Sequence, residues 1–241
     1  MKIGVKTYKD EKFLKHFENQ ADFFEVQAIQ KNNYNFLKKF SKPIVIHAEH
    51  FKQGSNPADK TMLKQNLKSI NFAIKLADKT NAKKIILHSG AIINKNCSKQ
   101  QSLNFIKKIK DKRIIIENLY MNNSITINPE NVKEFLKNTK VGFCFDVSHA
   151  IASANIQNLN PHILIQDFLK LKPSHFHIGG QKMNSKIDNH CSFSNPKSDI
   201  PLKKILSLYP KNAEITLETT TDIKKTQYDL EFIREIIKRI N

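Results

Sequence analysis

Short apolar runs alternate with amphipathic segments along this chain. Eight runs rich in Ile, Val and Phe have the length and composition of buried β-strands. They cover residues 2–7, 23–27, 43–47, 84–88, 113–117, 141–146, 174–178 and 214–218. The intervening segments place apolar residues at helical spacing, over residues 10–19, 33–40, 57–80, 98–110, 129–138, 161–171, 199–208 and 226–240. The pattern predicts eight successive units of a β-strand followed by an α-helix.

Three of the predicted helices carry a clear start signal. Asn56, Asn128 and Asn160 each stand directly before a proline. An asparagine side chain can cap the first free backbone N–H groups of a helix, and proline is favoured at the first helical position. We therefore expect helices to begin at residues 57, 129 and 161.

Eight such units close into a single (β/α)8 TIM barrel, because right-handed crossovers leave few other arrangements for parallel strands. A chain of 241 residues is long enough to form this barrel as one domain, residues 1–241. In this architecture the functional residues lie at the C-terminal ends of the strands. The longest irregular stretch, about residues 179–199, follows the seventh strand, and we expect it to be a functional loop.

Composition adds a strong positive charge. The chain has 40 Lys and Arg against 22 Asp and Glu, a formal net charge of +18. Such a charge favours a polyanionic partner such as nucleic acid. However, arginine occurs only at Arg113, Arg234 and Arg239, and the lysines are spread over helix faces. A solvated lysine shell explains the charge equally well.

We expect the protein to be cytoplasmic. The first residues, MKIGVKTYKDEK, lack the apolar stretch of a signal peptide, and no run reaches membrane-spanning length. We therefore expect no membrane partner, and we expect the protein to be a monomer. Three cysteines without zinc-ribbon spacing fit reduced thiols better than a disulfide framework.

Six consecutive predicted strands end on a side chain that can bind a metal. These residues are His47, His88, Glu117, Asp146, His177 and Glu218. A single histidine at a strand end is more often a hydrogen-bonded core residue than a ligand. Six together are different, because crowding three carboxylates beside three histidines without compensation would be costly. Imidazole and carboxylate are ligands of divalent cations, so the pattern predicts a metal site.

Three further residues extend this set to nine. His149 follows Asp146 in an Asp-x-x-His turn, and Asp188 and His190 lie in the loop after the seventh strand. Nine ligands exceed the needs of one ion, so we expect two or three. Three Zn²⁺ ions beside four carboxylates leave a surplus of about two positive charges, which suits an anionic phosphodiester substrate. Two ions held by one bridging carboxylate would also lower the pKa of a water molecule that lies between them. This is the chemistry of a hydrolase. His175 is interpreted as an interior barrel residue.

The segments HAEH, ILHSG, IIEN, FDVSHA, HIGG, DNH and LET resemble endonuclease IV, the apurinic/apyrimidinic endonuclease family 2 barrel within the xylose-isomerase-like superfamily. The resemblance covers most of the chain from the third strand onward. It implies a (β/α)8 barrel with three Zn²⁺ ions. Apart from the resemblance, Mn²⁺ is the alternative cofactor. The resemblance further implies base excision repair chemistry, in which the DNA backbone is cleaved 5′ to an abasic site. DNA that contains abasic sites is therefore the expected partner.

The resemblance also implies a division of the nine ligands among the ions. His47, His88 and Glu117 would hold the first zinc, and His149, Asp188 and His190 the third. The second zinc would be held by Glu117, Asp146, His177 and Glu218. Glu117 would bridge two ions and Glu218 would orient the attacking hydroxide, so these two are the expected catalytic residues.

Two positions are expected to contact DNA. Where the family has a tyrosine that reaches into DNA this chain has His50, and where the family has an arginine that faces DNA it has Asn189. The family's His-x-Asn-Asp after the seventh strand is replaced by HIGG, and the glycine-rich segment after the Asp-Arg-His signature reads CSFSNPKSD. The chain is also shorter than typical members, which implies trimmed recognition loops.

The main alternative is a sugar or sugar-phosphate isomerase or epimerase of the same superfamily. Such enzymes resemble this chain at four ligands for one divalent ion such as Mn²⁺, namely Glu117, Asp146, His177 and Glu218. They do not usually need the other five, which favours the endonuclease. A hydrolase of another phosphoester or nucleotide remains open. A non-enzymatic DNA-binding barrel is disfavoured, because a binding surface has no use for nine converging ligands.

Overall fold

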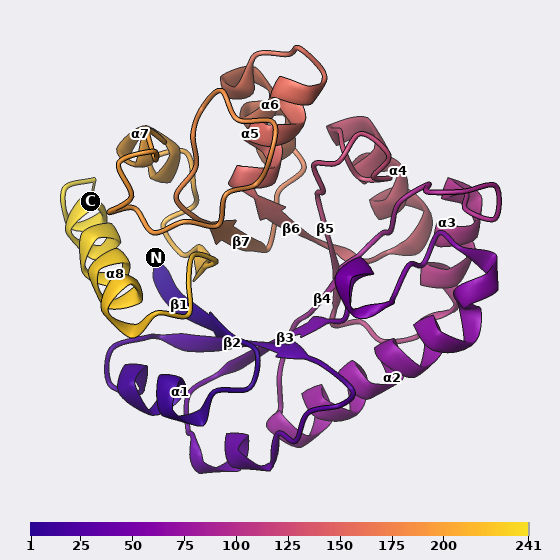
Figure 1. Ribbon diagram of the computed structural model, residues 1–241, viewed down its shortest axis with the longest axis horizontal. Helices are drawn as coiled ribbons and strands as arrows, with labels where there is room; N and C mark the ends of the chain where they lie inside the picture. The colour runs from indigo at the N-terminus through magenta and orange to yellow at the C-terminus, as the bar shows by residue number, and fades with distance from the viewer. Residues whose placement is uncertain (241) are drawn as a thin grey trace.

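A computed structural model describes residues 1–240, so Asn241, the last residue of the predicted domain 1–241, lies outside the described residues. Eight parallel strands form a closed barrel in sequence order, and the last strand pairs with the first (Figure 1). The strands are β1 Lys2–Thr7, β2 Phe23–Ala28, β3 Ile44–Ala48, β4 Ile85–His88, β5 Ile114–Glu117, β6 Gly142–Asp146, β7 His175–Ile178 and β8 Glu214–Leu217. The predicted (β/α)8 barrel is confirmed.

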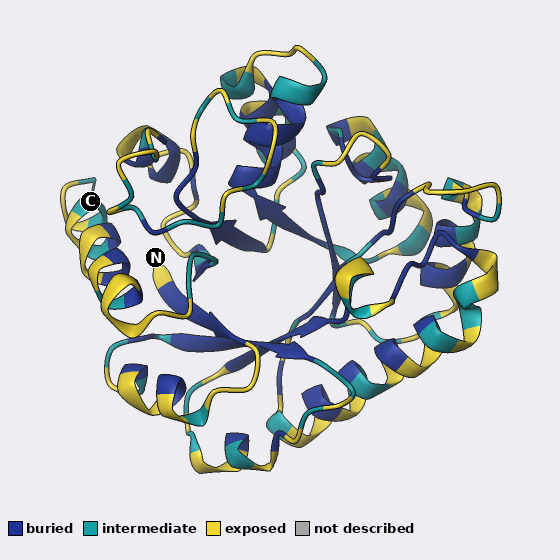
Figure 2. Ribbon diagram, in the orientation of Figure 1, coloured by how far each residue is buried: buried dark blue, intermediate teal, exposed yellow. Residues whose placement is uncertain are grey.

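Helices surround the barrel. They are α1 Glu11–Phe17, α2 Leu63–Thr80, α3 Lys99–Lys108, α4 Pro129–Thr139, α5 Val147–Ile156, α6 Pro161–Leu169, α7 Leu202–Leu206 and α8 Ile223–Lys238, with 3₁₀ helices η1 Asn35–Lys39, η2 Phe51–Gln53 and η3 Lys60–Met62. Their inner faces are buried against the strands and their outer faces are exposed (Figure 2). Within residues 1–240, no helix is both long enough and apolar enough to cross a membrane.

Polar side chains define where most helices begin. Asn128 accepts a hydrogen bond from the backbone N–H of Asn131, and Asn160 accepts one from His162, so two of the three predicted caps are confirmed. Asn56 was wrongly predicted as a cap. Its side chain instead hydrogen-bonds both backbone groups of Ala91, at 2.9 and 3.0 Å, and so joins two loops. Helix α2 therefore begins only at Leu63, after η3.

The predictions for two other segments were wrong. The predicted helix 33–40 is only the short 3₁₀ helix η1. Helix α5 was not predicted, because residues 146–149 were interpreted as a turn. Its sequence VSHAIASANI is buried from Val147 to Ala154, so it lacks the polar face that marks a surface helix. Asp146 caps this helix directly at the end of β6.

The interior of the barrel has an apolar floor. Alternate residues of a strand point to the same side, and the inward side chains Phe23, Val45, Ile86, Ile115 and Cys144 form one buried cluster. In each of these strands the inward residue two positions later is polar; these residues are Glu25, His47, His88, Glu117 and Asp146. The strand period therefore places a polar layer above the apolar one, at the C-terminal end of the barrel.

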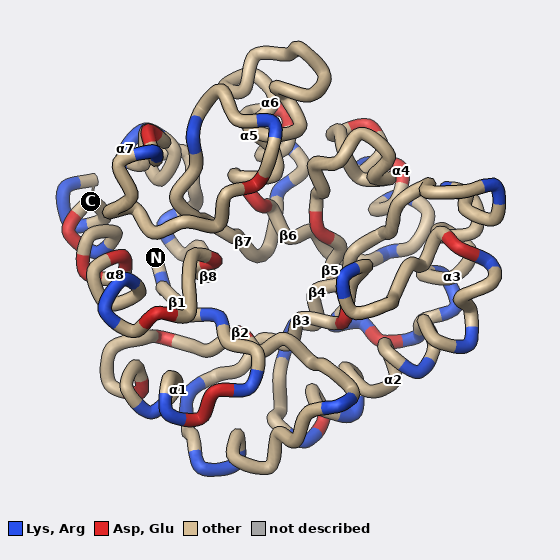
Figure 3. The backbone as a smooth tube through the Cα atoms, viewed as in Figure 1, with Lys and Arg blue, Asp and Glu red and all other residues tan. Residues whose placement is uncertain are grey.

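Charged residues are distributed round the outer ring. Figure 3 shows Lys and Arg on most of the helices and connecting loops, without a single cationic side in this view. The three cysteines are free, as expected.

One prediction tests the packing of the floor. Gly4 leaves room for the Phe23 ring, and a Cβ atom at position 4 would overlap that ring. The substitution Gly4→Ala is expected to lower the free energy of unfolding by about 1–3 kcal/mol, as overpacking does in other cores. Urea denaturation of Gly4→Ala, Phe23→Leu and the double variant measures the coupling. We expect the double variant to be less destabilised than the sum of the single variants, and strict additivity would contradict this packing.

Candidate metal centre

The structure brings all nine predicted ligands together at the C-terminal end of the barrel. They form three groups, in each of which the candidate ligand atoms lie within 4.8 Å of one another. The groups are His47, His88 and Glu117; Glu117, Asp146, His177 and Glu218; and His149, Asp188 and His190. Glu117 belongs to two groups. This division is the one that the resemblance implied, while the roles of these residues as metal ligands stay predictions.

Glu117, at the end of β5, is the centre of the cluster, and its side chain is only 1% exposed. Its Oε2 atom lies 2.9 Å from Nε2 of His88 and 3.3 Å from Nε2 of His47. Its Oε1 atom lies 3.0 Å from Nδ1 of His177. The two carboxylate oxygens therefore face different histidines, which is the arrangement a bridging ligand needs.

His177 connects Glu117 to the last strand. Its Nδ1 atom lies 2.7 Å from Oε2 of Glu218 and 3.8 Å from Oδ2 of Asp146. Asp146 uses its other oxygen, Oδ1, to accept a hydrogen bond from the backbone N–H of His149 at 2.7 Å. This helix cap places His149 on the first turn of α5, beside the cluster. The Asp-x-x-His spacing is thus the geometry of a helix cap.

The third group depends on the loop between β7 and α7. Asp188 contacts Nε2 of His190 directly, and it lies 3.4 Å from Nε2 of His149. Gln181, which is buried, donates to the carbonyl of Ile187 and accepts from the N–H of Asn189, so it holds the loop from within. Sequence reasoning did not single out Gln181, since one glutamine in a polar loop carries no distinguishing pattern.

A close backbone contact also holds this loop. Gly180 pairs with Cys191 through two backbone hydrogen bonds, at 2.8 and 3.3 Å. A Cβ atom at position 180 would lie 2.6 Å from the Cys191 carbonyl oxygen, so the contact requires glycine. The HIGG sequence thus serves to bring Asp188 and His190 back over the barrel.

The ring nitrogens that point away from the cluster have acceptors of their own. Nδ1 of His47 donates to the carbonyl of Ala48 at 2.9 Å, and Nδ1 of His149 donates to the carbonyl of Asn118 at 2.8 Å. Nδ1 of His190 donates to the carbonyl of Glu218 at 3.0 Å. Each bond makes Nε2 the nitrogen that faces the cluster, and metal-binding histidines are commonly oriented in this way.

Burial and neighbouring charges shift the pKa values of the cluster. Burial lowers the pKa of His88 to about 4 and raises the pKa of Asp146 to about 6. Burial also disfavours the charged form of His190, but the hydrogen bond to Asp188 and the charges of Glu218, Asp188 and Asp146 together outweigh burial and raise the pKa to about 9. His190 is therefore an imidazolium at pH 7. A cation that binds beside Asp188 has to displace this proton.

A cavity of about 400 Å³ lies over the cluster. Its lining includes His50, whose ring stacks on that of His88 with the centroids 4.8 Å apart. Asn189 does not line this cavity. Its side chain is exposed and accepts a hydrogen bond from the backbone N–H of Lys182 at 3.4 Å. The structure thus brings one of the two expected DNA-contacting residues to the cluster.

Sequence reasoning missed two charged residues from the first two strands. Lys6 of β1 is 8% exposed, and Glu25 of β2 is fully buried. The Nζ atom of Lys6 lies 2.7 Å from Oε1 of Glu218, and Oε2 of Glu25 lies 2.9 Å from Nε2 of His177. A signal was present, because a glutamate inside the apolar run FFEVQA has to be compensated.

The donor set fits divalent cations. Imidazole nitrogens and carboxylate oxygens converge from separate elements of the barrel. Four carboxylates so close together repel one another unless positive charge lies between them. Several of these groups could therefore hold metal ions.

No protein-family model and no curated protein matches this sequence. Solved structures do match. A D-tagatose 3-epimerase-like protein is 20% identical with a TM-score of 0.78, over 100% of this chain and 98% of the other. Endonuclease IV from Thermus thermophilus is 14% identical with a TM-score of 0.77, over 99% and 100%. A further protein from that organism, soaked with ZnCl2, is 16% identical with a TM-score of 0.73, over 99% of both chains.

At these identities the likeness establishes the fold. The chain has the same (β/α)8 barrel fold as these structures, in agreement with the fold that the sequence resemblance implied. Enzymes with quite different reactions use this barrel, so the fold alone does not select among them.

Proton release tests whether the cluster binds a cation at His190. Because the pKa of His190 is raised to about 9, Zn²⁺ binding at pH 7 is expected to release a proton from it. The affinity should rise with pH up to about 9, since fewer protons then compete. Isothermal titration calorimetry in buffers of different ionisation enthalpy measures the release. His190→Asn should release about one proton fewer, and a heat independent of the buffer would contradict the expectation.

Proposed function

We propose that this protein is a zinc-dependent phosphodiesterase of the endonuclease IV type, which cleaves the DNA backbone 5′ to an abasic site. The observation that carries the proposal is the division of nine side chains into three groups, two of which share Glu117. One ion uses four to six ligands, so a single-ion enzyme would leave several of these side chains without a role. Three ions use all of them.

Charge supports an anionic substrate. Three Zn²⁺ ions beside four carboxylates would leave a surplus of about two positive charges, which attracts a phosphodiester. The formal net charge of +18 favours a polyanionic partner as well. The lysines surround the barrel, so they supply general attraction to nucleic acid (Figure 3).

The residues of the cluster have distinct tasks in this reaction. When bound, zinc stabilises negative charge on the phosphate and lowers the pKa of water. Glu117 holds the centre with one oxygen toward His47 and His88 and the other toward His177. Glu218 orients the attacking water, and the proton of that water passes to solvent. The water oxygen bonds to phosphorus and the bond to the 3′ oxygen breaks, which leaves a 3′ hydroxyl, protonated from solvent, and a 5′ phosphate.

The cavity suits a single sugar-phosphate unit. Its volume of about 400 Å³ is far too small for a duplex, so a nucleotide would have to turn out of the helix to reach the cluster. An abasic residue meets this requirement most easily, because it has no base to unpair. Tyr8, Phe51 and Tyr120 line the cavity together with His50, and such side chains can contact the displaced sugar and its neighbours.

The second candidate function is isomerisation or epimerisation of a sugar with one divalent ion. The group of Glu117, Asp146, His177 and Glu218 would suffice for it, and the D-tagatose 3-epimerase-like structure has the same fold. The cavity volume also suits a monosaccharide. This function leaves His47, His88, His149, Asp188 and His190 without a task, which is why we rank it second.

Incision of defined DNA tests the proposal. Zinc-loaded protein is expected to cut a duplex with one abasic site on its 5′ side. Glu218→Gln should be slower by about 10²-fold or more, because the attacking water is no longer held in position, and Glu117→Gln should lose activity similarly. Glu49→Gln is the matched control, because Glu49 is also buried but hydrogen-bonds Gln30. No incision by the wild type, with isomerisation of a ketose, would favour the second candidate.

Metal content separates the two candidates without any substrate. We expect about three zinc ions per chain, because nine ligands form three groups. Mass spectrometry of metals in the purified protein measures this number. The His190→Ala variant should retain about two ions, since it disrupts the third group. One manganese ion per chain would indicate the isomerase.

A further inference from the structure

A set of buried polar side chains lies directly beside the second ligand group. It consists of Lys6 on β1, Glu25 on β2, His175 on β7 and Thr216 on β8, and each is at most 8% exposed. None of them belongs to the nine predicted ligands. Buried charges are costly unless they are paired, so this set needs an explanation.

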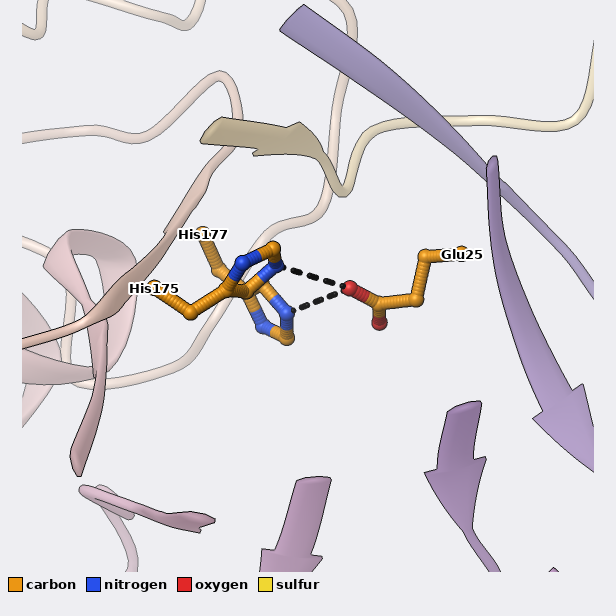
Figure 4. Close-up of side chains that lie close together, drawn as sticks. All are labelled: Glu25, His175 and His177. Atoms are coloured by element: carbon orange, nitrogen blue, oxygen red, sulfur yellow. Dashed lines mark hydrogen bonds and ion pairs between the residues drawn. The ribbon is translucent and has the colours of Figure 1, made fainter. Parts of the chain in front are cut away.

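Glu25 collects three donors on one oxygen. Its Oε2 atom lies 2.7 Å from the hydroxyl of Thr216, 2.9 Å from Nε2 of His177 and 3.4 Å from Nε2 of His175. Figure 4 shows both imidazole rings directed at this carboxylate oxygen. His177 thus donates to Glu25 through Nε2, and its Nδ1 atom is directed at Glu117 and Glu218.

His177 differs from its neighbours in the acceptor that it uses. The outer nitrogens of His47, His149 and His190 donate to backbone carbonyls. His177 donates to a charged carboxylate instead. A carboxylate acceptor makes the imidazole a more basic ligand than a carbonyl does. Glu25 therefore both orients His177 and strengthens it as a ligand.

Lys6 links Glu25 to the ligand from the last strand. Its Nζ atom lies 3.3 Å from Oε1 of Glu25 and 2.7 Å from Oε1 of Glu218. It balances the charge of Glu25, and it also occupies one of the two oxygens of Glu218. The remaining oxygen, Oε2, lies 2.7 Å from Nδ1 of His177. Lys6 thus leaves Glu218 with a single oxygen for the cluster.

The same atoms could also be taken for an additional metal site, since Glu25, His175 and His177 lie within 4.8 Å of one another. The contacts argue against this. The hydroxyl of Thr216 donates to Glu25 and accepts from Nε2 of His175 at 2.9 Å, so Oε2 of Glu25 and Nε2 of His175 already have hydrogen-bond partners. The ammonium of Lys6 would also repel a second cation.

We propose that Glu25 and Lys6 are positioning residues of the second ligand group, Glu25 by fixing and polarising His177 and Lys6 by making Glu218 a one-oxygen ligand. The inference rests on the metal site of the proposed function, and it adds two residues from strands that supply no ligand. It also explains why a glutamate and a lysine are adjacent across β1 and β2, where Lys6 pairs with Glu25 in the register.

Cobalt titration tests the proposal without DNA. The full-length protein is stripped with a chelator and titrated with Co²⁺ while its visible absorption is recorded. Glu25→Gln is expected to weaken one Co²⁺ site by about 10- to 100-fold, as loss of such a supporting carboxylate does elsewhere, and to leave the other sites unchanged. Lys6→Met is expected to lower the visible absorption of that site, because a second oxygen of Glu218 raises the coordination number. Lys6→Arg should restore the spectrum.

Two controls separate positioning from general loss of structure. Glu49→Gln removes another buried glutamate charge, one that hydrogen-bonds Gln30 and belongs to none of the ligand groups, and should keep wild-type affinities. If Lys6→Met does not fold, the double variant Glu25→Gln/Lys6→Met removes both charges of the pair and still weakens the same site. The proposal would be overturned if Glu25→Gln and Glu49→Gln lowered the Co²⁺ affinity equally, or if Glu25→Gln bound Co²⁺ with the affinity of the wild type.

Activity separates this inference from the function on which it rests. Suppose that the wild type binds Co²⁺ but does not cut abasic DNA, and that Glu25→Gln weakens Co²⁺ binding. The positioning roles would then hold, and the phosphodiesterase function would be refuted. If the wild type incises abasic DNA and Glu25→Gln binds Co²⁺ as the wild type does, the proposed function would hold and the positioning roles would be refuted.

Discussion

The site depends on a single buried carboxylate. Glu117 is 1% exposed at the end of β5, and its pKa is held well below its usual value: burial acts to raise it, but His177 and His88 outweigh burial. A buried charge in this position is costly unless neighbouring groups compensate it. His47 and His88 come from the preceding strands and His177 from a later one. These strands bring their side chains to one place only when the barrel is closed, so the compensation of the Glu117 charge depends on barrel closure.

The alternation of side chains along the strands places the apolar floor of the barrel directly below the polar cluster. The side chains that fill the floor of the barrel and those that form the cluster alternate with outward residues, so each polar residue stands two positions after an inward one. The apolar floor excludes water below, and the loops cover the cluster from above. Electrostatic interactions inside such a site are stronger than in water, both the favourable and the unfavourable ones.

The supporting residues complete the cluster. Backbone carbonyls orient three of the histidines, and Glu25 orients His177. Helix α5 and the loop after β7 add the third ligand group, which the barrel strands alone do not supply. The nine side chains therefore depend on three kinds of support: strand ends, one helix cap and one loop held by Gln181 and Gly180.

The sequence by itself determined the eight strands, the barrel and the identity of the converging side chains, because strand period and burial are local properties that apolar runs record. It did not reveal helix α5, whose buried surface removes the amphipathic signal, or the role of Asn56, whose partner Ala91 is distant in the chain. Only the tertiary structure decided that Lys6 and Glu25 join the cluster. The glutamate inside the apolar run FFEVQA shows that a partner is needed, but the partners lie on β7 and at the end of β8, and a local sequence pattern cannot identify contacts across a closing barrel.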